Sequence, residues 1–449
     1  MSIKISLIGA GSAVFSLSMI RDLCLTPSLE DATVSFMDID PARLDAAHAL
    51  AVRYAQSVGS KLRLEKTTDR LASLDGADFV LNSALAAGHH RLRDGWEIAR
   101  RHGYRMGGSL HIVHDEAFWI NFYQLKLFDS ILQDMQRICP DAWYIQIANS
   151  VLSGTTMLGR KYPQAKIVGL CHGFHGVYSL IRALGLDPTD CHFELPGVNH
   201  FLFLTHLYHK GQDAFPLIDR WIETQAAKGW PTDWLSSDLG PAPVDVYKRF
   251  GAFPIGDTAT PGGGSWPWWY HTDDAAEARW QEAPIDWYYK WYFPALEKNI
   301  AEIRRVSADP AANPVELVGP EKSNESAIRI IESIACDLPQ TYIVNILNVG
   351  EFVPGVPRDF SVEIPALVSK LGIQGIRTNG LPRPLLAHVL RDRVAPVEME
   401  LAAYEQGSKQ LLRQLIMLDP WTRSVEQADA FLDELLALPY HEEMREHYR

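Results

Sequence analysis

Two short segments carry residue types that hold transition metals in proteins. Cys171 closes the apolar run AKIVGL and is followed by His172, and His200 closes the segment GVNH further along the chain. A thiolate and an imidazole bind divalent metals well, and ligands gather at the carboxyl ends of strands in open α/β sheets. An isolated buried cysteine is more commonly a small apolar residue of the core. The residues therefore indicate either a metal site or ordinary packing, and their spacing alone leaves both open.

The first residues of the chain carry the parts of a dinucleotide site. The apolar run at residues 3–8 leads into the sequence GAGS, which starts at Gly9, and Asp38 ends a second apolar run. Glycines at such a turn let backbone N–H groups approach a pyrophosphate, and a carboxylate at the second strand end accepts hydrogen bonds from a ribose. The third glycine of the full motif is missing, so a purely structural turn is the alternative. Because an acid would repel a 2′-phosphate, Gly9, Gly11, Ser12 and Asp38 predict NAD instead of NADP.

Six apolar runs alternate with helical patterns in the first part of the chain. Residues 41–58 and 116–138 have the strongest helical patterns. Strands that alternate with helices of about 12 or more residues imply βαβ units and a mainly parallel sheet. The sequence therefore predicts an α/β fold with an N-terminal Rossmann domain, residues 1–190, that binds NAD. The predicted strands are residues 3–8, 32–40, 62–68, 77–84, 142–149 and 165–171.

This alternation fades beyond residue 190. Residues 256–274 are rich in Pro, Gly and Trp, which is typical of a long functional loop. Helical patterns return at residues 295–306 and 323–336, and they dominate from residue 384 onward. We therefore expect residues 191–449 to form a mixed α/β, helix-rich C-terminal domain that carries the catalytic and substrate contacts and those of the oligomer.

The composition excludes several classes of protein. Hydrophobic residues make up 47% of the 449 residues and charged residues 22%, with a formal net charge of −13. A nucleic-acid-binding protein would show a basic face, and no apolar run approaches the roughly 20 residues that span a bilayer. The N-terminus lacks the features of a signal peptide, and the five cysteines are too sparse for a disulfide framework. We expect a cytoplasmic protein with reduced thiols, no nucleic-acid partner and no membrane association.

The order of the motifs resembles that of a known enzyme family. GAGS, DID, IAN, CHG and GVNH follow one another here as they do in glycoside hydrolase family 4. That family consists of NAD- and divalent-metal-dependent glycosidases, often manganese enzymes, with a lactate/malate-dehydrogenase-like fold. The segments FGAFPIGDT, LDPWTRS and LPYHEEMREHY are similar to those of the branch that contains bacterial α-glucuronidases. The resemblance implies NAD⁺ and a divalent metal, above all Mn²⁺, held by Cys171 and His200, and we expect a homodimer or homotetramer.

The resemblance also implies a mechanism, because this family departs from the usual pair of catalytic carboxylates. NAD⁺ takes a hydride from sugar C3, and the metal polarises the resulting ketone, so that the C2 hydrogen becomes acidic. A base removes that hydrogen, the C1 leaving group is eliminated, water adds at C1 and the hydride returns. Asp257, in the GDT motif, is the candidate base, and Tyr270 is the alternative. Asn149 is expected to contact sugar hydroxyls.

Two residues depart from the pattern of the family. Asn149 is followed by Ser150, where the family usually has proline. Relatives that act on 6-phosphorylated sugars have an aspartate where this chain has His172, so a 6-phosphosugar substrate is not expected. Imidazoles are common general acids in enzymes, so His172 is a candidate general acid, with orientation of Cys171 as the alternative. His175 is a further candidate for the acid.

Aromatic and basic residues provide candidate substrate contacts. Trp266 lies in the predicted loop with two further tryptophans, and aromatic faces pack against sugar rings. Ordinary core or inter-subunit packing is the alternative. Arg105 and His111 are candidates for binding a substrate carboxylate, since a guanidinium matches that geometry. Surface charge is the more common explanation for a single arginine.

An α-glucuronidase acting on a small-molecule glycoside is therefore the leading prediction. Within the family, α-galacturonidase and α-glucosidase or α-galactosidase are the alternatives. An NAD-dependent hydroxy-acid dehydrogenase shares the fold but would not need Cys171 with His200. A non-catalytic NAD-sensing protein would leave the CHG, GVNH and GDT motifs without a purpose.

Overall fold

A nine-stranded sheet organises the molecule in the computed structural model, which describes residues 3–12, 15–230, 239–258 and 266–449. Six of its strands are parallel and follow the order β3-β2-β1-β4-β5-β6, the order of a Rossmann fold. The predicted α/β architecture is thereby confirmed. These strands are β1 (Lys4–Ile8), β2 (Thr33–Met37), β3 (Arg63–Thr67), β4 (Phe79–Asn82), β5 (Trp143–Gln146) and β6 (Lys166–Gly169).

Side chains of the central strands are buried on both faces of the sheet. In β1, Ile5 and Leu7 belong to one hydrophobic core, whereas Ile8 belongs to the core on the other side. Successive side chains of a strand point to opposite faces, so a parallel strand covered by helices on both sides must be apolar throughout. This requirement explains the continuous apolar run at the start of the chain.

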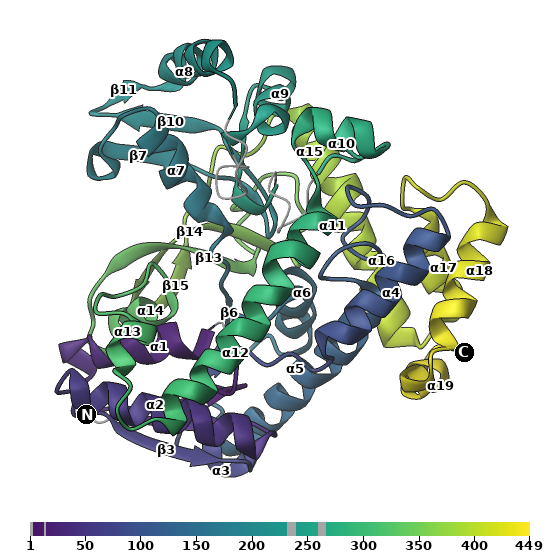
Figure 1. Cartoon of the computed structure of the whole chain (residues 1–449). Helices are drawn as coiled ribbons and strands as arrows, with labels where there is room; N and C mark the ends of the chain where they lie inside the picture. The colour runs from purple at the N-terminus through teal and green to yellow at the C-terminus, as the bar shows by residue number, and fades with distance from the viewer. Residues whose placement is uncertain (1–2, 13–14, 231–238, 259–265) are drawn as a thin grey trace.

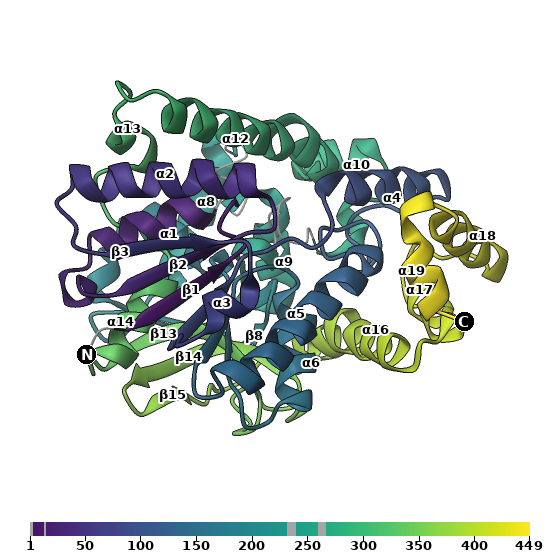
Figure 2. The same ribbon diagram turned by 90° about the horizontal axis from the view of Figure 1, so that it is seen from below.

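Helices cover the two faces of the sheet. Figure 2 shows α2, α12 and α13 together on one side, where α2 contacts both of the other helices. The helices of that face are α1 (Phe15–Cys24), α2 (Pro41–Ser57), α12 (Phe293–Ala308), α13 (Pro314–Val318) and α14 (Ala327–Ala335). The opposite face is covered by α3 (Arg70–Leu74), α5 (Phe118–Ile138) and α6 (Val151–Lys161).

Three antiparallel strands from the second half of the chain extend the same sheet. They are β13 (Gln340–Leu347), β14 (Ser361–Ser369) and β15 (Gly372–Gly375), and β13 pairs with β6 through Asn345 and Gly169. The sequence analysis did not predict these strands. The sheet therefore crosses the expected boundary at residue 190, and the division into residues 1–190 and 191–449 stays a prediction.

Two further groups of elements lie beside the sheet (Figure 1). One contains two small sheets and their helices, and the other is helical and includes the C-terminus. The first comprises α7 (Gly176–Ala183), β7 (Cys191–Glu194), β8 (Gly197–Val198), β9 (Phe201–Leu204), β10 (His206–His209), β11 (Gln212–Asp213), α8 (Phe215–Lys228), α9 (Pro241–Phe250) and β12 (Phe253–Ile255). The second comprises α4 (His89–Arg101), α10 (Asp274–Trp280), α11 (Pro284–Trp287), α15 (Arg383–Val389), α16 (Ala395–Gln406), α17 (Lys409–Met417), α18 (Val425–Leu436) and α19 (Glu442–His447).

None of the helices in the described part of the chain has the length and apolar character that a membrane span requires.

Candidate active site

The loop after β1 forms a nucleotide cradle, which consists of Gly9, Gly11, Ser12 and Asp38. Gly9 has a φ of +83°, and a Cβ atom there would lie 2.6 Å from the backbone of Ala84. The backbone N–H of Gly11 donates to Asp38 Oδ2 at 2.8 Å, and that of Ser12 donates to the carbonyl of Gly9 at 3.0 Å. Glycine is required at both positions because the loop approaches its neighbours so closely. The four predicted cofactor residues are thus held together at the end of the parallel strands.

Three predicted residues meet in a donor cluster, which consists of Cys171, His200 and Asp257. Their ligand atoms all lie within 4.8 Å of one another. Asp257 Oδ2 lies 3.4 Å from Cys171 Sγ and 3.4 Å from His200 Nε2. Sulfur, nitrogen and carboxylate oxygen are the donor types of many divalent transition-metal sites. The residues present therefore fit a metal ion of this class.

Two glycines allow Asp257 to reach Cys171. The short helices η2 (Gly173–His175) and η5 (Gly256–Thr258) pack against each other. A Cβ atom on Gly173 would lie 2.2 Å from Asp257 Oδ2, and one on Gly256 would lie 1.7 Å from the carbonyl oxygen of Gly173. No side chain fits in either place, so these glycines set the geometry of the donor cluster.

His200 is held in a strained backbone conformation. Its φ is +58°, a left-handed value that few residues other than glycine adopt. Its neighbour Asn199 donates from Nδ2 to Glu363 Oε2 at 2.9 Å, which anchors the turn to β14. Burial raises the pKa of Glu363 to about 7, against the lowering effects of Asn199 and His200. Strain of this kind persists only where the surroundings impose it, and it is concentrated at functional sites.

Burial and mutual charge shift the pKa values within the donor cluster. Burial and the charge of Asp257 raise the pKa of the Cys171 thiol to about 12. Burial lowers the pKa of His200, but the negative charges of Cys171 and Asp257 outweigh it and hold that pKa well above the usual value. The thiol of Cys171 and the carboxylate of Asp257 lie together in a small buried volume, where their negative forms repel each other. A divalent cation bound there would stabilise both negative forms.

The structure adds residues that the sequence analysis did not select. Asn149 Nδ2 donates to Asp115 Oδ2 at 2.9 Å, and His114 Nδ1 lies 2.7 Å from Asp115 Oδ1. His114, Asp115 and His200 form a second group of potential ligands within 4.8 Å. The predicted residue Asn149 thus lies beside the donor cluster. The polar run HIVHDE ending at Glu116 was the available signal in the sequence, but only His111 in it was considered.

A buried charge network surrounds His200. Glu116 Oε1 lies 3.2 Å from His200 Nδ1 without meeting hydrogen-bond geometry, and neither oxygen of Glu116 has a hydrogen-bond partner among the described residues. Arg393, which is fully buried, places its guanidinium 4.5 Å from the ring centroid of Phe201. Burial lowers the pKa of Arg393 to about 10, whereas Asp392 and Glu116 act to raise it. Polar atoms left open in a buried site are expected where a ligand completes them.

One tyrosine is electrostatically linked to this network. Tyr288 is buried in the π-helix η7 (Tyr288–Tyr292). Burial, followed by the negative charges of Asp115, Tyr292 and Asp257, raises its pKa well above the usual value. Nothing in the local sequence distinguishes Tyr288 from its aromatic neighbours, so only the fold shows its place.

Other predicted residues lie elsewhere. The hydroxyl of Tyr270 donates to Asp245 at 2.7 Å, and no contact among the described residues joins it to Asp257. Trp266 is buried against Phe201 and donates from Nε1 to Asp392 at 2.9 Å. These contacts correspond to core packing, the alternative to a role in sugar binding. The structure therefore does not bring Tyr270 or Trp266 to the donor cluster. Residues 259–265 of the predicted loop lie outside the described residues.

The candidate carboxylate-binding residues are already paired. Arg105 Nη2 lies 2.7 Å from Asp274 and 3.3 Å from Glu277. His111 Nε2 lies 3.0 Å from Glu400 Oε2 in a buried contact. Neither side chain forms a hydrogen bond or ion pair with the donor cluster in the described part of the chain, and both are held by acidic residues of the protein itself.

No hydrogen bond or ion pair among the described residues joins the imidazole of His172 or His175 to a ligand atom of the donor cluster. The side chain of His172 is 57% exposed, and its Nδ1 lies 3.6 Å from Glu325 Oε1. His175 lines a cavity beside η2. An exposed imidazole next to Cys171 remains accessible to substrate, so the prediction that His172 is the acid stays open.

Comparison with known proteins decides the family. Residues 4–186 match the model of "Family 4 glycosyl hydrolase", and residues 195–422 match that of "Family 4 glycosyl hydrolase C-terminal domain". Together the two matches span most of the chain. The chain belongs to glycosyl hydrolase family 4. The predicted family is confirmed, and this membership favours a glycosidase over the dehydrogenase and sensor alternatives.

Family 4 relatives of full length share about a quarter of the sequence. An α-galactosidase of Bacillus subtilis is 26% identical over 97% of both chains. An α-galacturonidase of Thermoanaerobacterium saccharolyticum is 25% identical over 97% of this chain and 95% of that protein. Relatives thus carry the names of different activities, and identity at this level does not separate them.

Solved structures confirm the fold. A 6-phospho-α-glucosidase from gut microorganisms, in complex with NAD and Mn²⁺, aligns with a TM-score of 0.81 at 18% identity and 98% coverage of both chains. A malate dehydrogenase of Cryptosporidium parvum aligns with a TM-score of 0.50 at 15% identity, covering 90% of this chain and 99% of that one. The dehydrogenase-like fold that the sequence predicted is therefore confirmed.

Proposed function

We propose that this family 4 protein cleaves α-glucuronides with the help of NAD⁺ and a divalent metal, most favourably Mn²⁺. The observation that carries the proposal is the donor cluster, in which Cys171, His200 and Asp257 meet within 4.8 Å. It lies at the carboxyl end of β6, at the same sheet edge as the nucleotide cradle. A dinucleotide and a metal would thus face one substrate from two sides.

In this proposal the nucleotide cradle holds NAD⁺, with the turn at Gly9 next to the pyrophosphate and the carboxylate of Asp38 next to the ribose. The approach of Gly9 to Ala84 leaves no room for a side chain. Asp38 is partly exposed, and its carboxylate organises the loop through Gly11. When bound, NAD⁺ supplies hydride acceptance and return, and the metal supplies Lewis acidity.

Cys171 and His200 would hold the metal. The thiolate is the softer donor and selects transition metals over Mg²⁺ and Ca²⁺. His114 and Asp115 form a second group of potential ligands with His200, so His200 is shared by the two groups. Asp115 also accepts a hydrogen bond from Asn149, which orients that amide toward a sugar hydroxyl.

Asp257 would act as the base that takes the C2 proton. Its side chain is 20% exposed, and Gly173 fixes its approach to Cys171. A carboxylate can remove this proton only when the neighbouring carbon has become a ketone, so the base must lie beside both cofactors. His172 would donate a proton to the leaving group from the solvent side, where Glu325 faces its Nδ1. Tyr270 is bonded to Asp245 instead, which favours Asp257 as the base.

The glucuronide specificity rests on sequence similarity in three segments and on His172. His172 replaces the aspartate of relatives that act on 6-phosphorylated sugars, which disfavours those substrates. α-Galactosidase and α-galacturonidase are the second candidates, because relatives of both names share about a quarter of the sequence. We also propose a cytoplasmic homodimer or homotetramer, which sedimentation of the purified protein would test.

A panel of 4-nitrophenyl α-glycosides tests the proposed function. The α-glucuronide, α-galacturonide, α-galactoside and α-glucoside are compared with NAD⁺, Mn²⁺ and a thiol reductant present, and with each omitted. We expect the α-glucuronide to be cleaved fastest, and only when both cofactors are present. Faster cleavage of another glycoside would reject the α-glucuronide specificity but not the NAD⁺-dependent glycosidase activity. Cleavage that is independent of NAD⁺ would reject the NAD⁺-dependent activity itself.

A further inference from the structure

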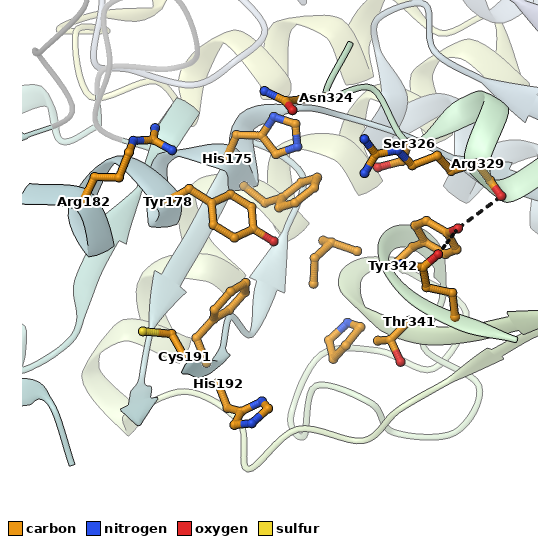
Figure 3. A pocket seen from close by; sticks show the side chains of 15 residues that line it. His175, Tyr178, Arg182, Cys191, His192, Asn324, Ser326, Arg329, Thr341 and Tyr342 are labelled. Carbon is orange, nitrogen blue, oxygen red and sulfur yellow. Dashed lines mark hydrogen bonds between the residues drawn. The ribbon is translucent and has the colours of Figure 1, made fainter. Parts of the chain in front are cut away.

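A cavity lies beside η2, and Figure 3 shows the residues that line it. Its volume is about 490 Å³, within the range of small-molecule sites. One wall comes from η2, α7 and β7, and the other comes from the loop before α14, from α14 itself and from β13 and β14. The cavity is therefore built by segments far apart in the sequence.

The cavity is lined by two arginines and by no acidic residue. Arg182 of α7 and Arg329 of α14 reach it from opposite walls, and Figure 3 shows them on either side of His175. Neither guanidinium has a carboxylate partner within ion-pair distance in the described residues. Arg182 makes a 3.4 Å hydrogen bond to Ser179, and Arg329 one of 3.3 Å to the carbonyl of Ser323. No aspartate or glutamate is among the lining residues.

Neutral polar and aromatic groups complete the lining. Burial, together with the positive charges of His172, Arg329 and Arg182, lowers the pKa of His175 to about 4, so this imidazole is neutral at physiological pH. The remaining polar lining residues are Asn324, Ser326, Gln340, Thr341 and Tyr342, and the rings of Phe174, Tyr178 and Phe193 provide flat apolar surfaces.

We propose that this cavity binds a small molecule that carries a phosphate, sulfate or carboxylate group, with Arg182 and Arg329 holding the anion. Each guanidinium group lacks an acidic partner among the described residues, so each can donate charge-assisted hydrogen bonds to an anionic group that enters the cavity from its side. Asn324 and Thr341 offer bonds to hydroxyls, and the aromatic rings suit a sugar-sized body. None of the residues of the anion site belongs to the donor cluster, so sulfate binding can be measured separately from glycoside cleavage.

The position of η2 connects this anion site to the chemistry. Gly173 packs against Asp257, and His175, two residues later, lines the cavity. An anion between Arg182 and Arg329 would therefore lie one short helix away from Asp257. Two sources of such an anion are chemically equivalent, namely a charged leaving group of the substrate and a separate effector.

Equilibrium dialysis of radiolabelled sulfate against the protein saturated with NAD⁺ and Mn²⁺ tests the site. Saturation with NAD⁺ occupies the other phosphate-binding surface. We expect one sulfate per chain with a Kd on the order of 1 mM or tighter. R182Q and R329Q should each weaken binding by about tenfold or more, whereas R182K and R329K, which keep the charge, should weaken it less.

R220Q is the matched control, because Arg220 is an exposed arginine of α8 that does not line the cavity. It should bind sulfate as the wild type does. A sulfate effect on the KM of the glycoside alone would identify the ligand as part of the substrate, and an effect on kcat alone would identify an effector. Absence of stoichiometric sulfate binding, or equal binding in R182Q, R329Q and R220Q, would overturn the proposal.

Discussion

The nucleotide cradle and the donor cluster lie at one edge of the same sheet but are completed in different ways. In the cradle, Asp38 accepts hydrogen bonds from the N–H groups of Gly11 and Asp40, so its side chain is satisfied within the protein. Around the donor cluster, His200 Nδ1 faces Glu116 Oε1 at 3.2 Å without meeting hydrogen-bond geometry, and neither oxygen of Glu116 has a hydrogen-bond partner among the described residues. Native proteins rarely leave buried polar atoms without hydrogen bonds. The side chain of Asp38 is thus satisfied by folding alone, whereas we expect a bound ligand to complete the buried groups around the donor cluster.

Loss of the thiol should give the largest effect and should separate the two regions. We expect Cys171→Ser to lose at least about three orders of magnitude in kcat, because an un-ionised hydroxyl is a poor metal ligand and Lewis acidity contributes several kcal/mol. Bound manganese should fall with it, as measured by atomic absorption. NAD⁺ affinity should be unchanged in calorimetry. Full turnover of the variant in chelator would contradict the assignment.

Replacement of the candidate base should give the next largest effect. Asp257→Asn keeps the shape but removes the basic carboxylate, and general-base catalysis contributes about 10²–10⁴ in rate. We expect kcat to fall within that range while manganese and NAD⁺ remain bound. Loss of manganese in this variant would instead make Asp257 a metal ligand. A near-normal kcat would show that Asp257 is not the base and that another residue removes the C2 proton.

Substitution in the nucleotide cradle should change the affinity for NAD⁺ and not the chemical step. We expect Asp38→Ala to weaken NAD⁺ binding by about 1–3 kcal/mol, through the loss of charge-assisted bonds, and to narrow the preference over NADP⁺. Asp40→Ala is the matched control, because Asp40 caps α2 through Ala42 and Arg43. It should lower stability by about 1 kcal/mol and leave cofactor preference alone. Calorimetry that showed tighter NADP⁺ binding by the wild type would reject the NAD assignment.

A tyrosine outside both regions should have the smallest effect on turnover. Tyr270→Phe removes the hydrogen bond to Asp245, so we expect a loss of about 1–2 kcal/mol in the free energy of unfolding. Its kcat should stay close to that of the wild type, in contrast to Asp257→Asn. A fall in kcat as large as that of Asp257→Asn, with the fold intact, would support the phenolate base instead.

The same comparison explains what the sequence could predict. The cradle comes from contiguous residues of two neighbouring strands, and the requirement for Gly9 at the turn is visible in the order of residues. Cys171 was visible in the same way, as a residue at a strand end. The partner of Asn149, Asp115, lies on a loop before α5, and only the fold brings the two together.

Other features were missed for reasons that particular residues make clear. The strand β14 contains Pro365 in its middle, and proline within an apolar run argues against a strand. Trp266 looks the same in sequence whether it faces a sugar or, as here, packs against Phe201. Tyr288 is electrostatically linked to Asp115 and Asp257, which lie far from it in the sequence, so only the fold reveals this link.

The central claim is that cleavage proceeds through an oxidised sugar, and exchange at C2 tests it most directly. Cleavage of an α-glucuronide in D₂O, with NAD⁺ and Mn²⁺ present, should yield a sugar that carries deuterium at C2. Only a neighbouring ketone makes that hydrogen acidic enough for Asp257 to remove. Mass spectrometry and proton NMR of the product measure the label, and omission of NAD⁺ should abolish cleavage. An unlabelled product, together with cleavage that persists without NAD⁺, would contradict the account.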